Sequence, residues 1–205
     1  MAPASSFAGC LVAAPGALTG SPAGADGIGG PGAEQAWAAR ARCTTTTYDD
    51  DILLWSEQQA ELIRSLAGRR DLPDAFDAEN VAEEIASVGR SELAAVKGLI
   101  RRLLIRVMML TGDPDAAPVR HWRAEIVGFH GDMLRRYAPS MRQRIDLDAL
   151  WRSARQQVAL AYEGTPQQDA VAALPDAAPL GLDDLLAAPP DVAGLVRRVQ
   201  AAVRA

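Results

Sequence analysis

Hydrophobic residues after about position 47 recur every three, four or seven positions, which is the spacing of one face of an α-helix. Valine and isoleucine do not gather into alternating runs bounded by turn residues, so we expect no sheet. The pattern predicts an all-α fold, an antiparallel bundle of about four main helices followed by short C-terminal helices. The main helices are expected near residues 49–67, 77–110, 118–138 and 140–163.

Capping signals place the ends of these helices. Asp49, Asp50 and Asp51 put negative charge at the positive end of the first helix dipole. Gly89 is expected to kink the second helix or divide it in two, because glycine weakens a helix by about 1 kcal/mol relative to alanine. Pro118 suits the first position of the third helix, where its missing N–H group is not needed.

The C-terminal part is predicted to form shorter helices. Thr165, Pro166 and Gln168 have the spacing of a capping box with proline at the first helical position. Another short turn is expected over Leu182–Leu186, and spaced hydrophobic residues from Val192 predict a terminal amphipathic helix.

Residues 1–43 differ in composition from the rest, being alanine, glycine, proline and serine with almost no large hydrophobic side chains. Such a stretch cannot bury enough surface to offset the loss of conformational entropy, so a disordered leader is expected. The prediction for the chain is therefore a leader over 1–43, a helical domain over 44–188 and a C-terminal amphipathic helix over 189–205.

Charge divides the chain unevenly. Residues 44–88 carry a net charge of -8, residues 89–155 carry +6, and the whole chain carries -5. Either an acidic helix pair packs beside a basic one, or the basic helices present a face to an acidic partner. The overall acidity argues against nucleic-acid binding, which usually needs a basic excess.

Four polar and aromatic residues are candidates for a structural contact or a pocket: Trp55, Glu84, Trp122 and Arg123. We expect Glu84 to pair with Arg123 beneath the two tryptophans, because a partly buried carboxylate–guanidinium fork fixes the register of two helices. A ligand pocket and a catalytic site are the alternatives for the same residues.

Motifs for other chemistry are absent from the sequence. The chain has no GxSxG, SxxK, Walker or CxxC motif, and its two cysteines, Cys10 and Cys43, lie outside the periodic region. His121 and His130 lie nine residues apart and so face opposite sides of one helix. We therefore expect no metal, no cofactor and no catalytic residue. No apolar run reaches the roughly 18 residues of a membrane span, so no membrane contact is expected. Two cysteines without a metal motif are expected to be free thiols in a reducing cytoplasm.

Several segments, taken in order, resemble the bacterial family called domain of unknown function 29. They are Tyr48–Asp51 with Trp55 and Leu62, Glu79–Ile85 with Gly89–Glu92, Trp122–Arg123 with Ile126, Pro139–Met141, and Leu182–Leu186. The resemblance spans about residues 44–188 and implies an all-α fold with no assigned activity. It also implies a histidine and a lysine in the second helix, where this chain has Arg106 and Met109.

The function is not determined by these patterns, and three hypotheses remain. The first is a non-enzymatic helical module that binds an unknown protein partner or a second copy of itself. The second is a nucleic-acid-associated factor that uses the arginine-rich middle helices. The third is an enzyme whose site is assembled across helices.

Overall fold

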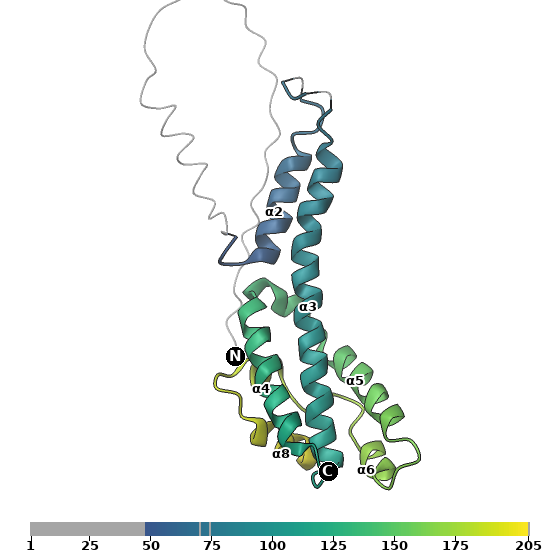
Figure 1. Cartoon of the computed structure of the whole chain (residues 1–205). Coiled ribbons are helices and arrows are strands. Elements are labelled where there is room, and N and C mark those ends of the chain that lie inside the picture. Colours follow the sequence, from purple (N-terminus) through teal and green to yellow (C-terminus); the bar gives the residue numbers. More distant parts are fainter. Residues whose placement is uncertain (1–47, 70, 74, 205) are drawn as a thin grey trace, which may run out of the picture. The chain divides into compact units, whose positions relative to one another are not determined.

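The computed structural model describes residues 48–69, 71–73 and 75–204, and every regular element in this part of the chain is a helix. This confirms the predicted all-α fold class. The predicted leader over 1–43 lies outside the described residues. The elements, labelled as in Figure 1, are α2 (Ile52–Arg64), α3 (Ala78–Gly112), α4 (Val119–Arg136), the 3-10 helix η1 (Pro139–Arg144), α5 (Leu147–Ala161), α6 (Gln168–Ala172), α7 (Leu182–Leu186) and α8 (Val192–Val203).

Aspartate side chains cap the N-termini of four helices. In each case a carboxylate oxygen accepts a hydrogen bond from the backbone N–H three residues later, at 2.7–3.0 Å. This satisfies one of the amide groups that a helix start leaves without a partner. The capping residues are Asp51, Asp77, Asp146 and Asp191.

Two predicted helix starts differ in detail. Pro118 is the residue before α4 rather than its first residue. Thr165 does not form the predicted capping box; its hydroxyl donates back to the carbonyl of Tyr162, and the Gln168 side chain accepts from the N–H of Gly164. The short helix α6 consequently begins later, at Gln168.

Helix α3 is a single helix through Gly89, so the alternative in which glycine divides it into two helices is wrong. A Cβ atom at position 89 would lie 2.1 Å from Ser56 Oγ and 3.0 Å from Leu53 Cα, both on α2. Glycine is needed here because the two helices approach closely, and its low helix propensity is overcome by their packing. Such an approach depends on a contact between helices and is not visible in local sequence.

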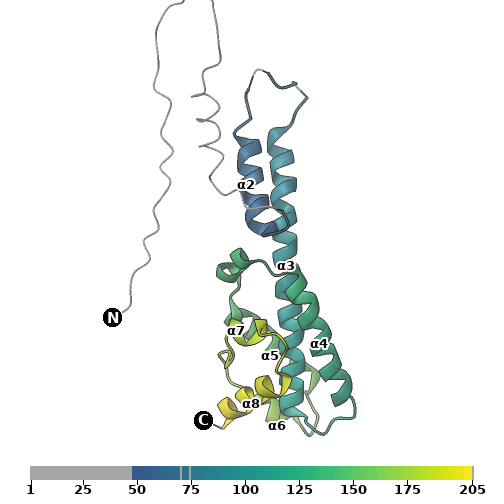
Figure 2. The same cartoon turned by 90° about the vertical axis from the view of Figure 1, so that its left-hand side faces the viewer.

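Helix α3 has 35 residues and is about 52 Å long, so neighbours pack along different parts of it. Helix α2 lies beside its N-terminal half, and α4, α5 and α8 lie around its C-terminal half (Figures 1 and 2). We call α2 and the first part of α3 (residues 52–90) the hairpin, and the remainder (residues 91–203) the body.

The body holds most of the hydrophobic core. Its fully buried side chains come from α3, α4, α5, η1 and the segments around α6 and α7, and include Leu103, Leu104, Met108, Ile126, Met133, Met141, Trp151, Leu174 and Leu185. The C-terminal helix belongs to the same core, because Leu195, Val196 and Val199 of α8 are buried in it. Helix α8 therefore packs on the body in the part of the chain that the structure describes.

Candidate interaction surfaces

The hairpin is held to the body at its base by Asp51. Besides capping α2, this buried carboxylate accepts hydrogen bonds from the Ser140 N–H at 2.9 Å and the Ser140 hydroxyl at 2.7 Å. Burial raises the pKa of Asp51, but the hydrogen bonds from Leu54 and Ser140 outweigh it and hold the pKa below its ordinary value. The charged form therefore ties the start of α2 to η1.

Above this base the two hairpin helices meet through small residues. Ala60 on α2 and Ala82 and Ala86 on α3 form a separate buried cluster, with Ile63 packed against it. Small side chains let the helix backbones approach each other, but they bury little apolar area. The hairpin therefore has a thin seam in place of a broad core.

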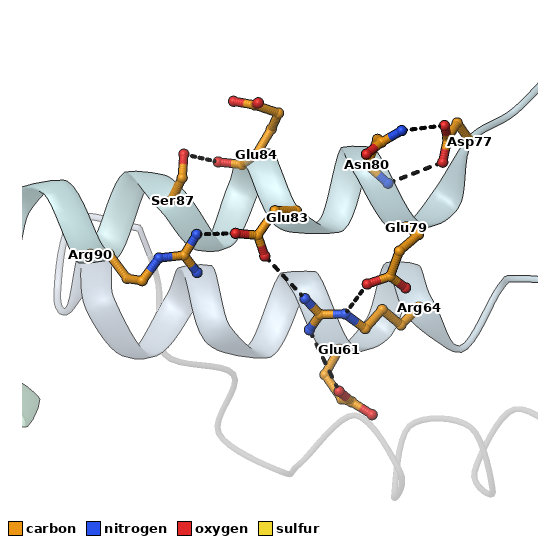
Figure 3. Close-up of polar contacts among 9 residues, drawn as sticks. All are labelled: Glu61, Arg64, Asp77, Glu79, Asn80, Glu83, Glu84, Ser87 and Arg90. Carbon is orange, nitrogen blue, oxygen red and sulfur yellow. Dashed lines mark hydrogen bonds and ion pairs between the residues drawn. The ribbon is translucent and has the colours of Figure 1, made fainter.

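One flank of the hairpin is polar (Figure 3). Arg64 of α2 lies 4.0 Å from the Glu61 carboxylate, 3.3 Å from Glu79 and 3.7 Å from Glu83. Glu83 is also paired with Arg90 on α3. These side chains are mostly exposed to solvent, so each pair contributes little to stability. Together they form an ion-pair network with more carboxylates than guanidinium groups.

The opposite flank of α3 is apolar. Val81, Ile85 and Val88 recur at spacings of four and three, and Ile85 lies about 200° around the helix from Glu83. Val81 is 37% exposed and Val88 is 40% exposed. Hydrophobic side chains on this flank thus remain accessible to solvent.

Exposed hydrophobic residues are concentrated on the hairpin and beside it. Seven large hydrophobic residues of the described part are exposed, and only Val127 and Leu160 lie in the body. The other five are Tyr48, Leu62, Phe76, Val81 and Val88. Phe76 also lines a hollow of about 330 Å³ at the tip, together with Leu66 and Leu72. Exposed hydrophobic side chains are therefore more frequent on and beside the hairpin than on the body.

The four residues singled out from the sequence do not come together. Trp55 is half-buried on α2, where its ring meets Tyr48 edge-on with centroids 5.0 Å apart. Trp122 is buried in the body core. Arg123 is exposed and lines a hollow with Leu110, near the far end of α3.

The predicted pairing of Glu84 with Arg123 is therefore wrong. Glu84 precedes Leu110 by about 39 Å along α3, at 1.5 Å per residue. Its carboxylate points away from the ion-pair network in Figure 3 and has no hydrogen-bond or ion-pair partner among the described residues. The prediction failed because α4 packs on the other half of the long helix.

The sequence did not indicate the polar link that does join α3 to α4. Arg106 Nε lies 2.7 Å from Glu125 Oε2, and its Nη2 donates to Oε1 at 3.0 Å. His121 lies 3.5 Å from the same carboxylate. The resemblance implied a histidine at position 106, and the arginine found there serves as a structural partner of Glu125.

The arginines of the middle helices mostly have partners within the chain. Arg101 donates to Gln157, Arg136 to Glu92, Arg142 to Asp183 and Arg144 to Glu57. They point to different helices, and paired guanidinium groups of this kind do not form the continuous basic stripe that nucleic-acid binding uses.

The histidines have separate environments. His121 is exposed beside Glu125, whereas His130 is buried and its Nε2 lies 2.9 Å from the carbonyl oxygen of Ala187. Among the described residues no group of three or more potential ligands could hold a metal ion. In the same part of the chain, no helix combines the length and the hydrophobicity that crossing a membrane requires.

These features define a class of protein: an all-helical domain built on one long helix, with an exposed hairpin at one end. Residues 47–189 match the model of the family described as Domain of unknown function DUF29, and the chain belongs to this family. A crystal structure of an alpha-helical protein of unknown function from Rhodospirillum rubrum is similar, with 38% sequence identity and a TM-score of 0.68. The similarity covers 75% of this chain and 97% of that one. No curated protein matches the chain.

Proposed function

We propose that this chain is a cytoplasmic, non-enzymatic protein-interaction domain, and that the hairpin is its contact surface. The observation that carries the proposal is that five of the seven exposed large hydrophobic residues of the described chain lie on or beside the hairpin, and only Val127 and Leu160 lie in the much larger body. A helix that binds in a groove uses apolar side chains at spacings of three and four, as Val81, Ile85 and Val88 are spaced.

The charge of the hairpin indicates the chemistry of the partner. Residues 52–90 contain eight acidic and four basic residues, a net charge of -4. Two hairpins that pack symmetrically on each other would bring like charges together, which opposes the contact. A partner protein with an apolar helix face bordered by lysine or arginine fits better, with Glu84 available to receive one of its charges.

Site-specific photocrosslinking in native cells tests this proposal. Benzoylphenylalanine is placed at Val81 or Leu62 on the hairpin and, as a matched control, at Leu160 on α5, which is 67% exposed. We expect one protein to crosslink from both hairpin positions and not from position 160. Crosslinking should fall in a Glu84→Lys background, because the charge is reversed beside the apolar flank.

Two other outcomes would count against the proposal. The same mixture of proteins crosslinked from all three positions would show that the hairpin is no more than ordinary surface. A second copy of this chain crosslinked from Val81 would replace the partner protein with self-association, and light scattering of the purified chain would then give the stoichiometry.

A further inference from the structure

A separate groove lies in the body, between α3 and α4. It has a volume of about 590 Å³ and is lined by Ala95, Leu99 and Arg102 of α3 and by Asp132, Arg135 and Arg136 of α4. Small-molecule sites in proteins usually have volumes of about 300–1,000 Å³. The groove is therefore large enough for a ligand bigger than a simple ion.

The two arginines on α4 are held in place by carboxylates. Arg135 is paired with Asp132 one turn earlier on the same helix. Arg136 donates from Nη1 to both oxygens of Glu92, at 3.0 and 2.8 Å. Partners of this kind restrict long side chains, so less entropy is lost when the same guanidinium groups bind a ligand.

Arg102 completes the groove from the opposite wall. Its guanidinium carbon lies over the ring of Phe129, 5.8 Å from the ring centroid. Unlike Arg135 and Arg136, Arg102 has no carboxylate partner among the described residues, so its charge is not balanced by an ion pair. The six lining residues together carry three positive charges and one negative charge.

The remainder of the lining is apolar. Ala95 and Leu99 lie one turn apart on α3, and Arg102 follows on the same face. A ligand that meets all of these groups has a charged end that accepts hydrogen bonds and an apolar body that lies on Ala95 and Leu99.

We propose that this groove binds a small phosphate monoester with an apolar or aromatic body. Guanidinium groups match both carboxylates and phosphates. Here they come from two helices on opposite walls, and the oxygens of a phosphate, arranged as a tetrahedron, accept hydrogen bonds from several directions. A planar carboxylate accepts chiefly within one plane.

Calorimetric titration of the full-length chain with phenyl phosphate, in a phosphate-free buffer at physiological salt, tests the proposal. We expect saturable binding that weakens about tenfold in an Arg102→Gln variant, the loss expected for one charge-assisted hydrogen bond. Arg101→Gln is the matched control. It removes the same charge from the neighbouring residue, but Arg101 donates to Gln157 of α5 at 2.7 Å, away from the groove.

Comparing the Arg101→Gln and Arg102→Gln variants tests whether binding occurs in the groove. Comparing inorganic phosphate and benzoate with phenyl phosphate tests which ligand the groove binds. Inorganic phosphate should bind more weakly than phenyl phosphate because it does not contact the apolar floor, and benzoate should bind more weakly than either. No saturable heat, or an equal loss of affinity in Arg101→Gln and Arg102→Gln, would overturn the proposal, since the effect would then be general attraction of anions. Benzoate binding as tightly as phenyl phosphate would overturn the assignment to a phosphate. An Arg135→Gln variant, which changes the opposite wall, should repeat the Arg102→Gln result.

Discussion

The hairpin and the body share one helix but are stabilised in different ways. The body surrounds the C-terminal half of α3 with large side chains such as Trp151, Leu104 and Met133, all fully buried. The hairpin joins α2 to the N-terminal half through Ala60, Ala82 and Ala86. Because hydrophobic stabilisation grows with the apolar area buried, the body carries most of the stability, and the hairpin depends on the close packing of small side chains.

This difference suits the two roles proposed for them. A surface that contacts a partner keeps hydrophobic side chains outside the core, as the hairpin does with Val81 and Val88. The groove proposed for a phosphate ester lies instead on the body, between α3 and α4. The following changes test how far the two regions differ.

The largest effect is expected from Trp151→Ala in the body. Trp151 is fully buried and its Nε1–H donates to the carbonyl of Pro175 at 2.8 Å. Its removal should lower the free energy of unfolding by about 3–5 kcal/mol, measured by urea denaturation. Trp55→Ala on the hairpin should lower it by less than half as much, because Trp55 is only half-buried. Equal losses would remove the distinction between the regions.

Smaller changes in stability are expected when two glycines of α3 are replaced by alanine, and the two changes should have opposite signs. Gly89→Ala should destabilise the chain by about 1–3 kcal/mol, because the new Cβ would overlap Ser56 Oγ and crowd the α2 backbone. Gly98→Ala should stabilise it by up to about 1 kcal/mol, since a Cβ there would meet nothing within 4 Å beyond the nearby backbone of its own helix, and alanine is the better helix former. Thermal unfolding of the two variants measures both. A stabilising Gly89→Ala would show that α2 is not held closely to α3.

The anchor at the base of the hairpin should give a pH-dependent effect. The folded pKa of Asp51 lies below its ordinary value of 3.8, so its charged form contributes stability above about pH 4, and this contribution is lost as the pH falls through the folded pKa. Asp51→Asn should therefore cost about 1–2 kcal/mol at pH 7. The difference from the unchanged chain should shrink below pH 3.8 in denaturation curves recorded across this range. A difference independent of pH would exclude a role for the charge.

The smallest effect is expected at Glu84 and Arg123. Glu84 lies in the N-terminal part of α3, whereas Arg123 lies on α4 beside the C-terminal end of α3. The effects of Glu84→Gln and Arg123→Gln on the free energy of unfolding should therefore add, within about 0.5 kcal/mol. A double-mutant cycle measures the coupling. A larger coupling energy would restore the pairing expected from the sequence and contradict the arrangement of α4.

The sequence patterns predicted those helices whose formation depends on residues close together in the chain. The helix over Ala78–Gly112 and the short turn over Leu182–Leu186 followed from hydrophobic spacing and helix-ending residues. The link between Asp51 and Ser140 could not be predicted, because the residues are 89 positions apart and the serine has no distinguishing motif. The continuity of α3 at Gly89 could not be predicted for the same reason, because it depends on the packing of α2, which lies outside that helix.

The candidate site was harder to predict than the fold. Glu84 and Arg123 are plausible partners by charge, but which half of α3 receives α4 is decided by the fit of side chains such as Ile126 and Met133 into the body core. The sequence indicated that the middle helices are rich in arginine, but it could not show which arginines share a groove, since Arg102 differs from Arg101 only in the direction it faces.

The continuity of α3 also has a mechanical consequence. A single unbroken ladder of backbone hydrogen bonds runs from the seam of the hairpin into the centre of the body, with no loop that could serve as a joint. The N-terminal half of α3 therefore projects from the body without a hinge. A molecule held by the proposed contact surface on the hairpin would therefore be kept at a set distance and angle from a ligand in the proposed groove of the body.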